Sequence, residues 1–314
     1  MAESGAEMRE VKQINLVFIL TVAVYLGVSL VVGLFQDKIS FVQLILLSQA
    51  GLAFVPVAYA LKRGQVRERI GFKKLDFGTV LLVLAFILCL EPFLTFLNAL
   101  SQCFVDTPTT SLITEQVDKL DFVTMFLVVA LLPAVLEEFV YRGVFFHAYG
   151  KVAVFPGAVL SGRLFGVMHG NLNQFTYAFF MGFFFSLAVY ATGSLFASMI
   201  MHLFVNGVSI VLLYAFPKLV SEAGETAETT LTVSYVLKSY SVPACVGVGL
   251  ALLLLRAISE RCGTKAKLKA ELKRKGKVRA FCGLFTAPLL IAVLLMFGIM
   301  ILSEVLTGML PAEG

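Results

Sequence analysis

Long apolar segments recur along the whole chain and constrain its fold more than any other feature. Each is close to the roughly 20 residues that an α-helix needs to cross the hydrocarbon core of a bilayer. Lipid offers backbone polar groups no partner, so only helices or closed barrels span it. The sequence therefore predicts an all-α polytopic transmembrane bundle of eight or nine helices. The segments begin near Gln13, Ser40, Phe77, Phe122, Val154, Asn173, Ser194, Ser239 and Ala280, and the one after Val154 is the shortest.

The composition agrees with a membrane protein and excludes an ordinary soluble domain. Of the 314 residues, 59% are hydrophobic and 14% are charged, whereas a soluble domain is about 45–50% apolar and about 25% charged. We interpret residues 1–314 as a single membrane domain. It divides into three N-terminal helices (13–104), four core helices (122–215) and two C-terminal helices (238–306). The five cysteines form no CxxC pair, which argues against a disulfide framework or a zinc cluster.

Basic residues gather in two loops, and these loops predict the orientation in the membrane. One loop (62–74) follows the second apolar segment and the other (256–279) follows the eighth. The positive-inside rule places both loops in the cytoplasm. We therefore expect a multi-pass plasma-membrane protein with a cytoplasmic N-terminus and with anionic lipid headgroups along 256–279. Since these headgroups explain the basic loop, no nucleic-acid partner is expected.

Two adjacent glutamates, Glu137 and Glu138, lie inside one of the membrane-length apolar segments, and Arg142 follows one helical turn later. A carboxylate in the bilayer interior costs several kcal/mol or more. Glu138 and Arg142 are four residues apart, so they share one helix face in the favoured acid-then-base order. Arg142 could hold Glu138 ionised and leave Glu137 free to act on water. The alternative is an ion pair near the membrane interface.

Two further pairs of polar and aromatic residues follow, each at a spacing of four. Phe165 and His169 form the first pair, and His202 and Asn206 form the second. An imidazole beside an amide offers two hydrogen-bond donors to a developing oxyanion. Taken singly, each pair could be a packed histidine or a polar contact between helices. Taken with the glutamates, they supply the base, proton shuttle and oxyanion donors that water attack on an amide bond requires.

The three motifs, Glu-Glu-x-x-x-Arg, Phe-x-x-x-His and His-x-x-x-Asn, resemble those of the CAAX protease and bacteriocin-processing (Abi) family. The flanking residues 164–175 and 192–198 look like those of bacterial members. The resemblance implies an intramembrane endopeptidase whose catalytic residues are Glu137, Glu138, His169, His202 and Asn206. In that family the glutamates activate water with His169 as their partner, and His202 with Asn206 forms the oxyanion site.

The resemblance implies supporting roles for Arg142, which would be structural, and for Phe165. Arg163 departs from the pattern, because the family usually has a small or apolar residue at this position. An unpaired charge in lipid is expensive, so we expect Arg163 to pair with Glu91, the other deep acid.

Two histidines and a glutamate could also form a zinc site. The sequence lacks His-Glu-x-x-His, and the histidines of the motifs come from separate helices. We therefore favour hydrolysis without a cofactor, with zinc at His169, His202 and a glutamate as the alternative. From the helix lengths we expect the site to open to the cytoplasm, about half a leaflet deep.

Two other function classes remain open from the sequence. A non-catalytic membrane partner, such as a bacteriocin self-immunity factor or a scaffold, would keep the motifs without using them. A transporter is disfavoured because no internal repeat is evident. For the enzyme, the expected substrate is a membrane-embedded peptide or protein. The bacterial-looking flanks favour a peptide pheromone, a bacteriocin leader or a small membrane protein.

Overall fold

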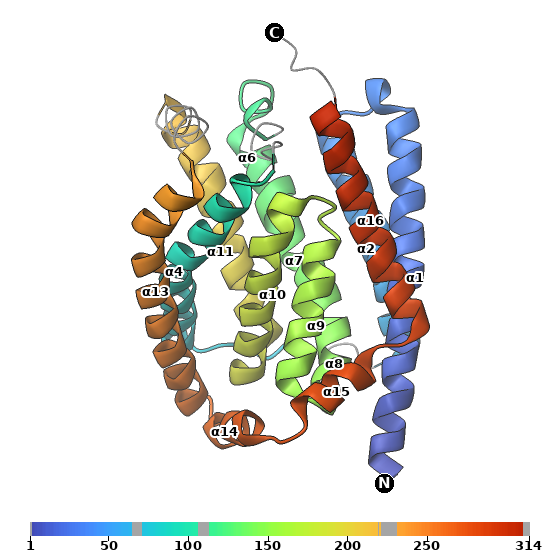
Figure 1. Cartoon of the computed structure of the whole chain (residues 1–314), viewed down its shortest axis with the longest axis vertical. Helices are drawn as coiled ribbons and strands as arrows, with labels where there is room; N and C mark the ends of the chain where they lie inside the picture. Colours follow the sequence, from blue (N-terminus) through green and yellow to red (C-terminus); the bar gives the residue numbers. More distant parts are fainter. Residues whose placement is uncertain (1, 65–70, 106–112, 219, 221–230, 310–314) are drawn as a thin grey trace.

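A computed structural model describes residues 2–64, 71–105, 113–218, 220 and 231–309. Within these residues the chain forms helices and turns without strands (Figure 1). Eight helical segments of the described part of the chain are long and apolar enough to cross a membrane, and α9 (Val154–Val167) is a shorter apolar helix. The prediction of an all-α bundle with eight or nine membrane helices is confirmed, and the chain is a multi-pass membrane protein.

Three of the spans form the first part of the chain, and a longer composite span follows. The first three are α1 (Ala2–Leu34), α2 (Phe41–Arg63) and α4 (Phe77–Gln102). A short 3₁₀ turn, η1 (Gln36–Lys38), joins α1 to α2. The fourth span is a continuous 31-residue segment, Phe122–Val152. Its successive parts are α6 (Phe122–Met125), η2 (Phe126–Leu131), α7 (Leu132–Glu138), η3 (Phe139–Phe146) and α8 (His147–Val152).

After α9, the chain continues through α10 (Leu172–Thr192), α11 (Leu195–Ala215) and α13 (Val233–Arg261). The predicted last span, beginning near Ala280, is wrong at its start. A short helix, α15 (Lys277–Leu284), ends there, and the span itself is α16 (Ala287–Met309). Pro288 explains the new beginning, because proline is favoured in the first turn of a helix. A polar helix, α14 (Lys265–Lys273), joins α13 to α15.

Polar side chains cap the spans where the apolar runs begin. Each cap accepts a hydrogen bond from a backbone N–H of the first helical turn, a group that the helix itself leaves without a partner. The capping residues are Ser40, Asp76, Asp121, Asn171, Ser194 and Thr232. These caps fix the helix ends and thereby the depth at which each polar side chain lies.

The N-terminus, α14 and α15 lie at the same end of the bundle, where the connection from α2 to α4 also runs (Figure 1). Both basic loops therefore share one end, as a cytoplasmic location for both requires. Arg67 and Arg69 of the first loop lie outside the described residues. The membrane itself and the orientation remain predictions. We call this the basic end.

The loop at the basic end is tied to the turn between α10 and α11. The backbone N–H of Leu195 donates to the carbonyl of Gly71 at 2.9 Å, and the Ser194 hydroxyl donates to the carbonyl of Lys73. The Thr264 hydroxyl, just before α14, donates to the carbonyl of Ala191 at 2.6 Å. These bonds close the bundle at the basic end.

Glycines bring α9 and α10 into backbone contact. A Cβ atom on Gly162 would lie 2.5 Å from the carbonyl oxygen of Phe179, and one on Gly182 would lie 2.8 Å from the Cα of Gly162. Small residues at such crossings let backbones approach and gain van der Waals contact, which drives helix association in lipid. The crossing fixes the height of Phe165 in α9 relative to α10.

The expected ion pair between Glu91 and Arg163 is wrong. Glu91 lies on α4 and Arg163 on α9, and α10 packs against both helices from between them. Neither side chain forms a hydrogen bond or an ion pair with any residue in the described ranges. The sequence indicates how far along its helix each of these two residues lies. It does not indicate where each helix stands in the bundle, so it could not show that α10 separates them.

We expect Gly162→Ala to destabilise the protein, because its Cβ would collide with the backbone of α10. Overpacking of this kind typically costs about 1–3 kcal/mol. Thermal unfolding in detergent should therefore show a lower midpoint for this variant. Gly249→Ala in α13 is the matched control, since a Cβ there meets no atom within 4 Å. Equal midpoints for the two variants would contradict the crossing.

Candidate active site

The segment that carries the two glutamates departs from regular α-helix on both sides of them. Two stretches of π-helix, η2 and η3, flank α7, which ends at Glu138. Local π-helix is rare and is frequently found at functional sites. Pro133 has no N–H and cannot bond the carbonyl four residues earlier, that of Val129. The Asn206 amide of α11 donates to that carbonyl at 3.1 Å.

Glu138 is fully buried and accepts two charge-assisted hydrogen bonds at one oxygen. Arg142 Nη1 donates to Glu138 Oε1 at 2.7 Å, and His202 Nδ1 lies 2.9 Å from the same oxygen. Both partners are buried as well. The spacing of four thus produces the Glu138–Arg142 contact, but the pair is buried in the bundle and not interfacial.

Arg142 is surrounded by aromatic rings. Its guanidinium carbon lies 4.4 Å from the ring centre of Phe165, 5.3 Å from that of Phe185 and 5.9 Å from that of Tyr141. The negative faces of aromatic rings attract a guanidinium group. Gly182 leaves room for the group, since a Cβ there would lie 2.9 Å from Arg142 Nη2.

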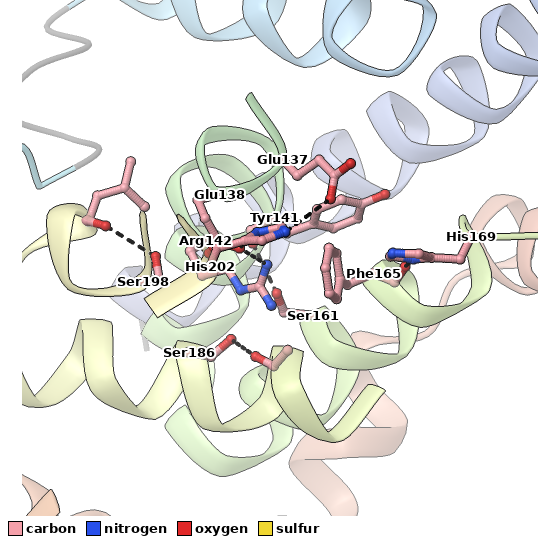
Figure 2. A network of polar contacts seen from close by, with 12 residues as sticks. Glu137, Glu138, Tyr141, Arg142, Ser161, Phe165, His169, Ser186, Ser198 and His202 are labelled. Carbon is pink, nitrogen blue, oxygen red and sulfur yellow. Dashed lines mark hydrogen bonds and ion pairs between the residues drawn. The ribbon is translucent and has the colours of Figure 1, made fainter. Parts of the chain in front are cut away.

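Glu137 is the half-buried member of the cluster, with its side chain 13% exposed. His202 Nε2 lies 3.9 Å from Glu137 Oε2, so the imidazole stands between the two carboxylates (Figure 2). Gln49 Nε2 donates to Glu137 Oε1 at 2.6 Å. Sequence reasoning missed Gln49. The sequence feature that could have indicated Gln49 is its polar amide side chain within the apolar segment 41–63.

Phe165 links the two histidines of the motifs. Its ring packs edge-on against His169 at a centroid distance of 4.8 Å and against His202 at 5.9 Å. His169 Nδ1 lies 2.8 Å from the Phe165 carbonyl (Figure 2). With Nδ1–H donating to that carbonyl, Nε2 is left as an acceptor. His169 makes no hydrogen bond to Glu137 or Glu138.

A cavity of about 620 Å³ joins these side chains. Of the residues predicted to be catalytic, Glu137, His169, His202 and Asn206 line it, while Glu138 lies behind them in the protein. The structure thus brings all five side chains to one place, with four of them at the cavity wall. Their catalytic roles remain predictions.

The cavity extends away from the basic end. Its wall includes Ile113, Thr114 and Val220, which lie near the opposite ends of the spans, and it includes no residue of the loops at the basic end. The predicted opening toward the cytoplasm stays a prediction.

No three His, Cys, Asp or Glu side chains are grouped as metal ligands within the described ranges. The five cysteines are all free thiols. The polar groups of the described site are carboxylates, imidazoles and amides. Their chemistry is proton transfer and hydrogen bonding.

The segment that carries these side chains was compared with known protein families. Residues 119–208 match the model of the type II CAAX prenyl endopeptidase Rce1-like family. This match supports the assignment to the CAAX protease family. The family is one of proteases, and the matched segment contains every residue of the three motifs. Gln49 and Glu91, which also line the cavity, lie outside it. No curated protein and no solved structure matches the chain.

We expect Arg142→Met to destabilise the protein strongly, because it leaves Glu138 as an uncompensated buried charge. Breaking a buried pair from one side typically costs about 3–5 kcal/mol. Denaturant unfolding in detergent should show this loss. The double variant Glu138→Gln with Arg142→Met removes both charges and should regain much of the stability.

The exposed pair Arg256–Glu260 supplies the matched control. Breaking a surface pair costs about 0–1 kcal/mol, so Arg256→Met should change unfolding little. A loss for Arg142→Met no larger than that for Arg256→Met would contradict a buried ion pair.

Proposed function

We propose that this chain is an intramembrane endopeptidase that hydrolyses a peptide bond in a membrane-associated peptide or protein, with water activated by Glu137. One observation carries the proposal. A carboxylate at the wall of a membrane-interior cavity is held by Gln49 and faces an imidazole that a buried carboxylate orients. Such an arrangement fixes a general base and leaves it accessible to water.

In the proposed reaction, Glu137 takes a proton from a water molecule, and the resulting hydroxide attacks the carbonyl carbon of the scissile bond. The carbonyl oxygen becomes an oxyanion. The tetrahedral intermediate collapses as the C–N bond breaks, and protonated Glu137 returns its proton to the leaving amine. The products are a carboxylic acid and an amine, and the base is regenerated. The acid then gives its proton to the amine, which leaves a carboxylate and an ammonium group.

We assign stabilisation of the oxyanion to His202 and Asn206. For His202 to donate from Nε2 while Nδ1 donates to Glu138, both ring nitrogens must carry protons. The formal charges of Glu137, Glu138, Arg142 and His202 then cancel within the cluster. Asn206 has two amide protons and gives one to the Val129 carbonyl, so the other is available. His169, with Nδ1 held, is the partner that accepts or relays a proton at Nε2.

The proposed mechanism uses no metal or other cofactor, and zinc at His169, His202 and a glutamate is the alternative. We place the protein in the plasma membrane of a bacterium, where basic residues 256–279 would contact anionic headgroups. The substrate would enter from the end of the bundle away from the basic end, since the cavity extends in that direction.

We expect Glu137→Gln to abolish cleavage with little change in folding. The amide keeps the size of the side chain but cannot accept the water proton, and loss of a general base typically reduces rate by about 10²–10⁴-fold. Mass spectrometry of peptide termini from host membranes should show termini in wild type that are missing from the variant at equal protein level.

Glu115→Gln, a change outside the cavity wall, is the control and should leave the termini unchanged. Metal analysis of the purified protein separates the metal-free mechanism from the zinc alternative. Identical termini in wild type and Glu137→Gln, with full rescue of a deletion phenotype by the variant, would instead identify a non-catalytic membrane partner.

We expect Asn206→Ala to lower kcat by about 10²–10³-fold, the usual effect of removing one oxyanion donor, with little change in KM. The same change also leaves the Val129 carbonyl without its partner. Adding Pro133→Ala restores an N–H to the chain near that carbonyl and separates the two effects. If the double variant regains wild-type kcat, the amide supports the helix and does not act on the oxyanion.

A further inference from the structure

The cavity has a second carboxylate that the proposed chemistry does not use. Glu91 lies on α4 and lines the same cavity as Glu137. It is half-buried and makes no hydrogen bond or ion pair with any residue in the described part of the chain. Arg163, its expected partner, lies on a helix beyond α10. An acid inside a membrane domain that lacks a protein partner calls for an explanation.

The one cation on the described wall is the proposed imidazolium of His202, which contacts Glu137 and Glu138. Lysine and arginine are absent from the lining residues within the described ranges. Arg142 lies behind the wall and is only 1% exposed, and its guanidinium group already contacts Glu138 and the aromatic rings. With the charges of Glu137, Glu138, Arg142 and His202 cancelling within their cluster, Glu91 is the carboxylate of the described wall that remains unbalanced. The potential beside it favours positive groups.

Glu91 belongs to a polar stripe along one face of α4. Thr95 and Asn98 follow it at spacings of four and seven, and both line the cavity. Residues at these spacings share one helix face. Two other amides at the wall, on α2 and α10, have a buried polar atom without a hydrogen-bond partner among the described residues, Gln49 Oε1 and Asn173 Nδ2. Buried polar atoms of this kind are costly unless a ligand or water bonds them.

We propose that Glu91 is a specificity residue that binds a basic side chain of the substrate, so that the enzyme prefers segments with lysine or arginine beside the cleaved bond. A basic side chain would pair with Glu91 while the peptide backbone meets the amides of the wall. A negatively charged group, such as a free C-terminal carboxylate, finds no lysine or arginine on the described wall, and His202 already contacts Glu137 and Glu138. This inference rests on the proposed function in taking the cavity to be the substrate chamber.

The test measures binding, so that it does not depend on cleavage. The Glu137→Gln protein is placed in nanodiscs of neutral phosphatidylcholine, where Glu91 is the remaining acid of the described wall and the lipid contributes no net charge. The probes are three fluorescent palmitoylated octapeptides of glycine and serine that differ at one central residue, lysine, glutamine or glutamate. Fluorescence anisotropy gives the three dissociation constants.

The lysine peptide should bind about tenfold more tightly than the glutamine peptide, and the glutamate peptide should bind most weakly. Adding Glu91→Gln should remove this order, and adding Glu91→Lys should favour the glutamate peptide. Thr95→Val, one turn away on the same face, is the matched control and should keep the order. Thermal unfolding checks that each variant is folded.

Equal binding of the three peptides by the folded protein would overturn the inference, and so would a lysine preference that persists after Glu91→Gln. Both results are read from binding and leave proteolysis to be judged separately. Absence of wild-type termini in host membranes would refute the proposed function without changing the measured charge preference. The two failures are therefore distinguishable.

Discussion

The contact between Glu138 and Arg142 is the interaction on which the rest of the site depends. A lone carboxylate or guanidinium would be prohibitively costly at this depth, and the pair is tolerated because the charges cancel and each has further partners. His202 shares the oxygen that Arg142 contacts, so its ring orientation follows from the pair. Through that ring, the buried pair determines what Glu137 faces at the cavity wall.

Close helix packing around Arg142 makes this buried charge possible. Gly182 leaves space beside the guanidinium group, and the same glycine meets Gly162 of α9 at the backbone crossing. That crossing also brings Phe165 over Arg142 and against both imidazoles. One contact between glycines therefore positions the aromatic residue that the Phe-x-x-x-His motif supplies. This explains physically why an aromatic ring is useful four residues before His169.

The sequence predicted interactions along one helix better than interactions between helices. Spans follow from apolar length, and the Glu138–Arg142 contact follows from a spacing of four. The expected Glu91–Arg163 pair was wrong because the depth of a residue along its helix does not show which other helix separates it from a possible partner. Gln49 was missed for the same reason, since its partner is 88 positions away.

The position of Glu137 gives the polar groups of the cavity wall a role in the proposed reaction. Glu137 is the middle residue of the Phe122–Val152 span, so in that reaction a scissile bond must reach the interior of the membrane domain to meet it. A peptide is cleaved in extended form, and its backbone N–H and C=O groups then lose the partners that a helix provides. Irregular backbone is tolerated at membrane depth where it lines protein or water. Hydroxyl and amide groups at the wall, such as Thr95, Asn98 and Ser209, can supply those partners. For the proposed reaction, these polar groups around Glu137 would therefore lower the cost of unwinding a substrate and hold the water that attacks it.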